Sequence, residues 1–214
     1  MSRIAIPTRD NAPASSQPIL DAVYKQLGFV PNLHRLMSIS PNVLTGFVGL
    51  QSSLVKTLDI KTRDAIALAV SEMNGCGYCL AAHSYVATNF ARMSPEEITL
   101  NRQGKSHDAT RAASATFAQH LMKAHGKVSD ADLQAVRDAG YSDAQILEMV
   151  ALSAQFLLTN FINNVAQTDS DFPALPASRP PEGQHRRCPR RHDAACAMPV
   201  TDPQGVSPAH YSPA

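Results

Sequence analysis

Apolar side chains recur every three or four residues over most of the chain, from residue 17 to about residue 172, with polar positions between them. This spacing puts the apolar side chains on one face of a helix, and no segment shows the sustained alternation that is typical of a strand. The sequence therefore predicts an all-α fold. Prolines, glycines and capping residues divide the pattern into predicted helices over about 17–30, 31–39, 41–58, 60–74, 77–92, 95–104, 108–125, 129–139 and 142–165.

Composition divides the chain into three parts. Residues 1–16 are polar and rich in proline, alanine and serine, which predicts an extended N-terminal arm. Residues 17–172 carry the helical pattern and form the predicted domain. Residues 173–214 contain nine of the 15 prolines, an arginine cluster and almost no aliphatic side chains. Such a segment buries too little apolar surface to offset the entropy lost on ordering, so it is predicted to be a disordered tail.

The predicted helix over 142–165 is apolar on more than one face, which indicates burial either in its own core or against another subunit. The formal net charge of +1 gives no electrostatic reason to expect nucleic acid or a membrane surface as a partner. The N-terminus has no apolar run of signal-peptide length, and no stretch reaches about 18 consecutive apolar residues. We therefore expect a soluble, cytoplasmic protein.

Two cysteines three residues apart, Cys76 and Cys79, are followed by His83. Gly75 ends the preceding predicted helix, so Cys76 falls at or near the N-terminus of the next one, where free amides and the helix dipole favour a thiolate. His83 is four residues after Cys79 and is therefore its neighbour on the helix surface. In a reducing compartment a structural disulfide is unexpected, so the pair indicates redox chemistry.

Metal binding is an alternative explanation of the same motif. Cys76, Cys79 and His83 could be three zinc ligands, but a structural zinc site needs a fourth, and the body of the chain holds no second metal-ligand motif. The side chains that could supply it through tertiary contact are Asp64, Glu72, His34 and His107. A third interpretation is that the two cysteines and the histidine are buried and have no function.

The predicted helix before the motif carries two carboxylates, Asp64 and Glu72. A carboxylate that faces the thiols could accept a proton. The alternative for both residues is a solvated charge on the helix surface.

The stretch LDIKTRDAIALAVSEMNGCGYCLAAHSYVATNF, residues 58–90, resembles the core of the carboxymuconolactone decarboxylase/AhpD-like alkylhydroperoxidase superfamily, and most of all its peroxidase-related branch. The likeness extends more loosely over residues 17–172. It implies an all-α helical bundle with the cysteine pair at the N-terminus of a central helix. It also implies assembly as a homo-oligomer, a trimer or a hexamer, which suits the apolar last helix.

The resemblance assigns roles to the motif residues. It makes Cys79 the thiol that attacks the peroxide, Cys76 the resolving partner and His83 a member of the proton relay. Asp64 holds the position where the family usually has Glu; the shorter side chain implies a bridging water, or a share of the role for Glu72. Tyr78 stands where well-studied members have a histidine.

The resemblance implies that no metal, haem or flavin cofactor is needed, and that a separate dithiol protein, lipoylated or thioredoxin-like, is the reductant. The leading hypothesis is a thiol-dependent peroxidase that reduces organic hydroperoxides or hydrogen peroxide through a Cys79–Cys76 disulfide. One alternative is a decarboxylase or isomerase of the carboxymuconolactone type that uses His83 and Asp64 as acid and base. The other is a non-catalytic module for redox sensing or zinc binding.

Overall fold

The computed structural model describes residues 2–173, so all but the first residue of the predicted tail lies outside the described residues. Every regular element in this part is helical, which confirms the all-α prediction. In chain order the elements are η1 (Ala14–Ser16), α1 (Gln17–Leu27), α2 (Asn32–Met37), α3 (Pro41–Leu54), α4 (Ile60–Met73), α5 (Gly77–Asn89), α6 (Pro95–Arg102), α7 (Ala109–Lys123), α8 (Asp130–Asp138) and α9 (Asp143–Ala166).

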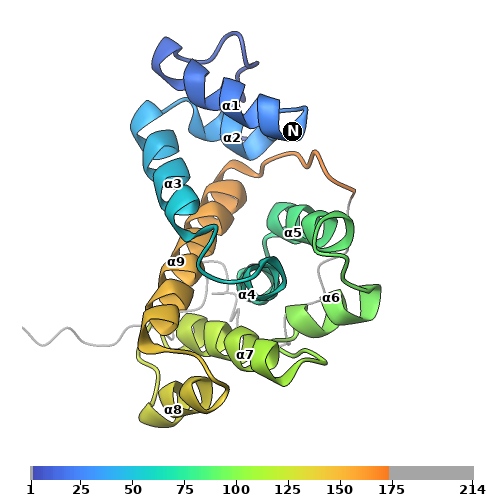
Figure 1. Cartoon of the computed structure of the whole chain (residues 1–214). Coiled ribbons are helices and arrows are strands. Elements are labelled where there is room, and N and C mark those ends of the chain that lie inside the picture. The colour runs from blue at the N-terminus through green and yellow to red at the C-terminus, as the bar shows by residue number, and fades with distance from the viewer. Residues whose placement is uncertain (1, 174–214) are drawn as a thin grey trace, which may run out of the picture. The chain divides into compact units, whose positions relative to one another are not determined.

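Helix α4 is the most enclosed element and packs against α5, α6, α7 and α9 (Figure 1). It begins at Asp59, whose carboxylate accepts hydrogen bonds from the first free backbone N–H groups, as an N-cap residue does. Its middle is rich in alanine, and Ala65, Ala67 and Ala69 are completely buried. Small side chains let neighbouring helices approach from several sides. The cysteine pair lies at the N-terminus of α5, which packs against α4, α6 and α9.

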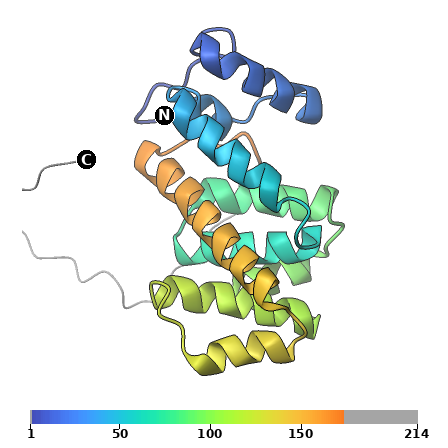
Figure 2. The same cartoon turned by 60° about the vertical axis from the view of Figure 1, so that its left-hand side comes forward.

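Helix α9 packs against α3, α4, α5 and α7, and Figure 2 shows it beside α3. One face is buried through residues such as Met149 and Leu152, while Leu147, Phe161 and Val165 are 71%, 55% and 64% exposed. Among the described helices, α9 alone is long and apolar enough to cross a membrane. It packs against four other helices, as a core helix of a globular domain does.

Several predicted helices end a few residues earlier than expected; the helix predicted over 77–92, for example, ends at Asn89. Two further helices show where the apolar pattern misleads. The helix predicted over 17–30 ends at Leu27, because Gly28 takes the left-handed conformation, with φ at +78°, that commonly terminates helices. The helix predicted over 41–58 ends at Leu54. Both differences lie at termini, where the apolar pattern continues into turn residues that still pack on the body.

The N-terminal arm departs from the extended conformation that its composition predicts. Ala12 is buried in the core, and the arm ends in the 3-10 helix η1. The Ser16 hydroxyl donates to the Ser38 carbonyl at 2.8 Å, and the Arg3 N–H donates to the Ala166 carbonyl at 2.6 Å. The arm is therefore fixed to α2 and to the end of α9.

Candidate active site

The turn between α4 and α5 brings the two thiols together. Gly75 has φ at +60°, a conformation that glycine adopts without steric cost, and Cys76 then caps α5. The Cys76 sulfur accepts a hydrogen bond from the backbone N–H of Cys79 at 3.3 Å. The two sulfur atoms lie 2.7 Å apart as free thiols. A disulfide can therefore form with little movement of the backbone.

The environment of Cys79 favours its thiolate. The pKa of Cys79 is lowered to about 7, first by the hydrogen bond from the Cys76 thiol and then by the amides of Asn163 and Asn160 and the charge of His83, against the opposing effect of burial. The Asn163 amide donates to the Cys79 sulfur at 3.3 Å. The pKa of Cys76 is raised, because its proton is held in the hydrogen bond to Cys79 and because the thiol is buried. Cys79 is therefore the thiol that ionises first.

His83 lies one turn after Cys79 and is held by a carboxylate from α4. Its Nδ1 atom is 3.1 Å from Oδ1 of Asp64, which is only 4% exposed. The His83 ring also packs edge-to-face on Phe156, with the ring centroids 5.0 Å apart. A carboxylate on Nδ1 fixes the ring orientation and tautomer, so Nε2 is the nitrogen that can accept or release a proton.

Glu72 and His107, which the sequence offered as a proton acceptor or as zinc ligands, have other partners. The Glu72 carboxylate forms an ion pair with Arg102 of α6 at 2.8 Å and does not line the cavity at the thiols. The backbone N–H of His107 donates to Glu97. Within residues 2–173, no three His, Cys, Asp or Glu side chains are grouped so that they could hold a metal ion.

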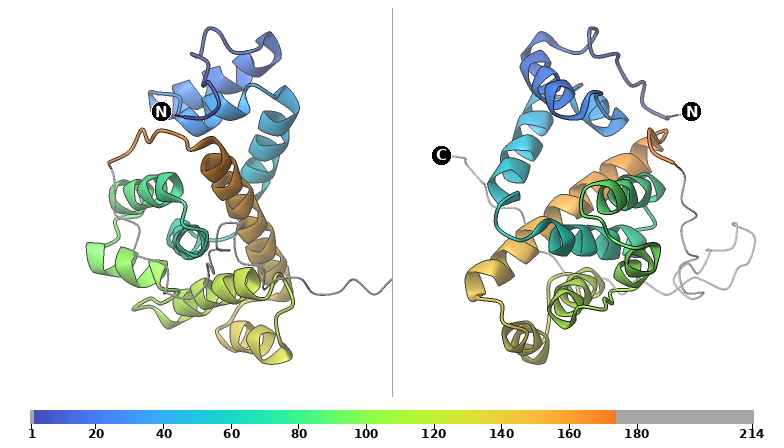
Figure 3. Two further views of the ribbon diagram at one scale, coloured as in Figure 1. Left: turned by 180° about the vertical axis from the view of Figure 1, so that it is seen from behind. Right: turned by 45° about the vertical axis from the view of Figure 1, so that its right-hand side comes forward.

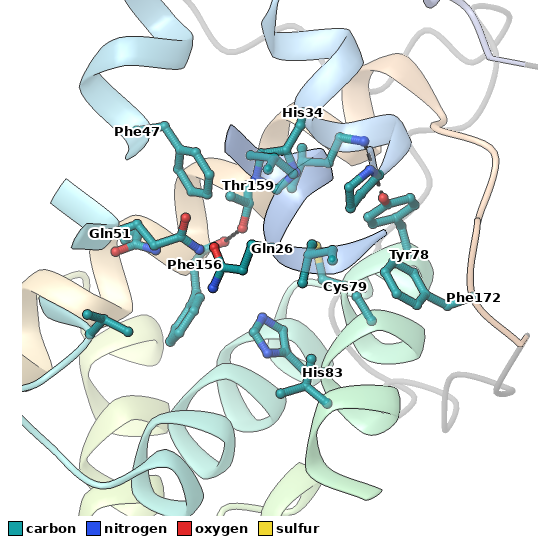
Figure 4. A pocket seen from close by; sticks show the side chains of 18 of the residues that line it. Gln26, His34, Phe47, Gln51, Tyr78, Cys79, His83, Phe156, Thr159 and Phe172 are labelled. Carbon is teal, nitrogen blue, oxygen red and sulfur yellow. Dashed lines mark hydrogen bonds between the residues drawn. The ribbon is translucent and has the colours of Figure 1, made fainter. Parts of the chain in front are cut away.

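A cavity of about 420 Å³ opens onto Cys79 and His83, and Figure 4 shows His34 on the opposite side of the cavity from His83. Burial lowers the pKa of His34 to about 4, so its imidazole is neutral at pH 7. Cys76 does not line the cavity. The walls come from α1, α2, α3, α5 and α9, from residues that flank α2 and α3, and from the segment after α9. Among the described residues, no Lys, Arg, Asp or Glu lines the cavity, and the lining residues are Val23, Gln26, Leu27, Pro31, Leu33, His34, Phe47, Gln51, Ser52, Val55, Tyr78, Cys79, Ala82, His83, Val86, Gln155, Phe156, Thr159 and Phe172.

Sequence reasoning missed the asparagines of α9. Asn163 contacts Cys79 directly, and Asn160 bonds to Ser71 and Asn74 at the end of α4. Asn160 and Asn163 are buried. Asn160 and Asn163 could have been predicted from the presence of amide side chains on an otherwise apolar helix, since buried polar groups require hydrogen-bond partners.

We predict that Asn163→Leu raises the pH at which Cys79 ionises, from about 7 in the unaltered protein. The change removes a donor to the thiolate and should move the midpoint up by about one pH unit. The rate of Cys79 alkylation, followed against pH by mass spectrometry of the Cys79 peptide, measures the midpoint. Asn164→Leu is the matched control, because this exposed amide bonds to the Asn74 carbonyl instead. An unchanged midpoint in the Asn163 variant would show that the Asn163 amide does not stabilise the Cys79 thiolate.

The fold and the site define an all-α protein with an adjacent pair of buried thiols, one of them open to an apolar cavity beside a carboxylate-held histidine. Residues 41–121 match the model of the carboxymuconolactone decarboxylase family. No curated protein matches the chain.

Solved structures share the fold. An uncharacterized peroxidase-related protein from Ralstonia eutropha JMP134, described as an alkylhydroperoxidase AhpD core, is 26% identical with a TM-score of 0.72, over 79% of this chain and 92% of that one. A peroxidase-related protein from Silicibacter sp. TM1040 is 22% identical with a TM-score of 0.69, over 78% and 91%. A cysteine-to-alanine variant of the debrominase Bmp8, solved in complex with 2,3,4-tribromopyrrole, is 21% identical with a TM-score of 0.67, over 79% of this chain and 93% of that one. The resemblance to the carboxymuconolactone decarboxylase/AhpD superfamily is therefore confirmed.

Proposed function

We propose that the protein is a thiol-dependent peroxidase that reduces organic hydroperoxides or hydrogen peroxide through a disulfide between Cys79 and Cys76. The observation that carries this proposal is the thiol pair itself. The sulfurs lie 2.7 Å apart, and the one that lines the cavity has the lowered pKa. The name of the 26% identical relative from Ralstonia eutropha agrees with this class of reaction.

In the first step His83 takes the proton of the Cys79 thiol, and the thiolate attacks one oxygen of the peroxide. A sulfur–oxygen bond forms and the oxygen–oxygen bond breaks. The electron pair leaves on the second oxygen, which takes the proton back from His83 and departs as an alcohol, or as water from hydrogen peroxide. Asp64 stabilises the imidazolium that exists between the two transfers. Cys79 is left as a sulfenic acid.

In the second step the Cys76 sulfur attacks the Cys79 sulfur. The disulfide forms, the sulfur–oxygen bond breaks, and the hydroxyl group leaves as water with the Cys76 proton. The short distance between the sulfurs favours this step over further oxidation of Cys79.

Turnover then needs a dithiol that supplies two electrons and two protons and becomes a disulfide itself. We propose a lipoylated or thioredoxin-like protein as this reductant. Cys79 lines the cavity, whereas Cys76 is completely buried. The reductant is therefore expected to attack the Cys79 sulfur and release Cys76.

We also propose that the chain forms a homo-oligomer, a trimer or a hexamer, in the cytoplasm. The apolar side chains on the outer face of α9 support self-association, because large exposed apolar patches commonly mark protein interfaces.

Intact mass and thiol counting, before and after one equivalent of cumene hydroperoxide, test the proposed function. The chain has two further cysteines, Cys188 and Cys196, which lie outside the described residues. The Cys188→Ser/Cys196→Ser variant is therefore used, so that only Cys76 and Cys79 are counted. We expect the loss of two thiols and two hydrogens without added oxygen. Two surviving thiols would contradict the proposal and favour acid–base chemistry by His83 and Asp64. A mass gain of one zinc would favour the metal-binding module.

A further inference from the structure

Tyr78, which stands between the two cysteines, connects the motif to two distant parts of the chain. Its hydroxyl donates to Oδ2 of Asp171 at 3.0 Å and accepts a hydrogen bond from the backbone N–H of Leu33 at 3.2 Å. Burial raises the pKa of Tyr78, so the hydroxyl keeps the proton that it donates. One side chain of α5 therefore contacts both α2 and the segment after α9.

The segment over residues 169–172 is joined to α2 by further hydrogen bonds. Oδ2 of Asp171 also accepts from the backbone N–H of Asn32 at 2.6 Å. The Asn32 amide donates to the Asp169 carbonyl at 2.9 Å. Figure 3 shows the chain after α9 running across from the end of that helix toward α5. We call these contacts of Tyr78, Asp171 and Asn32 the Tyr78 clamp.

The clamp places Phe172 in the wall of the cavity. The Phe172 ring packs edge-to-face on Tyr78 at 5.8 Å between centroids and on Phe29 at 6.1 Å. The Tyr85 ring also packs on the Phe172 ring, with the centroids 5.6 Å apart. Leu33, Tyr78 and Phe172 all line the cavity, together with Cys79. The apolar wall nearest the motif is therefore built from three separate segments that meet at the Tyr78 hydroxyl.

We propose that Tyr78 is a specificity-determining residue. The Tyr78 clamp holds the Phe172 side of the cavity wall in place. The body of a bulky organic hydroperoxide packs against this wall while its peroxide group reaches Cys79. This inference rests on the proposed peroxidase function. The cavity of about 420 Å³ is far larger than hydrogen peroxide, which fills roughly 60 Å³ at about 30 Å³ for each water-sized unit. A small peroxide makes little contact with the wall, whereas the aromatic or branched body of a larger peroxide makes extensive contact with it.

Tyr78→Phe tests the proposal, because it removes the hydroxyl and keeps the ring. The measurement is kcat/KM for cumene hydroperoxide divided by kcat/KM for hydrogen peroxide, with one dithiol reductant. We expect this ratio to fall about tenfold, mainly through KM for cumene hydroperoxide, as expected for the loss of a hydrogen bond to a carboxylate that holds the wall. Tyr85→Phe is the matched control, since it touches the same Phe172 ring from outside the cavity lining. Its ratio should stay unchanged.

Asp171→Ala, which removes the acceptor of the Tyr78 hydroxyl, and the double variant of Asp171→Ala with Tyr78→Phe separate the clamp from a general loss of stability. If the two side chains act through one hydrogen bond, the double variant has the ratio of either single variant. The proposal would be overturned if the effects of the two substitutions on the ratio multiplied in the double variant. It would also be overturned if kcat/KM fell equally for both peroxides.

Binding of 2-phenyl-2-propanol, the alcohol product of cumene hydroperoxide, provides a readout that needs no thiol chemistry. Isothermal titration should show about tenfold weaker binding to Tyr78→Phe than to the unaltered protein or Tyr85→Phe. If the protein consumes no peroxide but this difference is seen, the proposed function fails and the role of the clamp stands. Equal binding to all three proteins would overturn the role of Tyr78.

Discussion

Cys79→Ser is expected to abolish the consumption of peroxide, whereas Cys76→Ser should permit one oxidation and then stop. Cys79 lines the cavity, is neighboured by His83 and has a pKa lowered to about 7. Cys76 is completely buried and its pKa is raised, so it cannot replace Cys79 as the attacking thiol. Without Cys76, the sulfenic acid at Cys79 has no partner and is open to further oxidation.

The measurement follows peroxide loss with a dithiol reductant, and intact mass then identifies the state of the remaining thiol. Cys76→Ser should show a gain of one oxygen, followed by two or three when peroxide is in excess. Cys188→Ser/Cys196→Ser, which changes the two cysteines outside the described residues, is the control and should turn over normally. Normal turnover by both single variants of the motif would show that the cysteine assignment is wrong.

Asp64→Asn is expected to lower kcat/KM for peroxide by about 100-fold, the usual scale for losing assisted proton transfer. The Asp64 carboxylate lies 3.1 Å from Nδ1 of His83. An amide there can donate to Nδ1, which leaves the proton on Nε2, and Nε2 then cannot accept a proton from Cys79. The variant keeps the size of the side chain, so packing around this buried position changes little.

Glu72→Gln is the comparison variant. Because Glu72 pairs with Arg102, its change should have a much smaller effect on turnover than Asp64→Asn. The apparent pKa of the Cys79 thiol, measured by alkylation against pH, should rise in the Asp64 variant, since the charge of His83 contributes to the lowered value. Equal and small effects of both substitutions would exclude a carboxylate from the mechanism.

The structure also distinguishes the two predicted carboxylates, which their spacing along the chain could not do. Both lie on α4, and their spacing alone made either a candidate. The structure places Asp64 against His83 and Glu72 against Arg102 of α6. The resemblance to the family pointed to Asp64. The catalytic roles of both remain predictions until the substitutions are made.

The sequence by itself determined the features that depend on near neighbours. The helical repeat, the cap at Asp59, the break at Gly75 and the neighbouring positions of Cys79 and His83 all follow from contacts within a few residues. These local preferences are set by backbone sterics and hydrogen bonds and can be read along the chain. The helix ends at Leu27 and Leu54 do not follow from the apolar pattern, because fraying and turn conformations compete at helix termini.

Only the tertiary structure decided which distant groups meet at the thiols. Asn163 reaches Cys79 from 84 residues away, and Asp171 reaches Tyr78 from 93 residues away. The cavity and its Phe172 wall likewise exist only once α1, α2, α3, α5 and α9 have packed together. Such contacts depend on how the side-chain ridges of each helix fit the others, and on the need to pair buried polar groups. Helical periodicity identifies the buried face of each helix, but it does not identify the side chain that this face will meet.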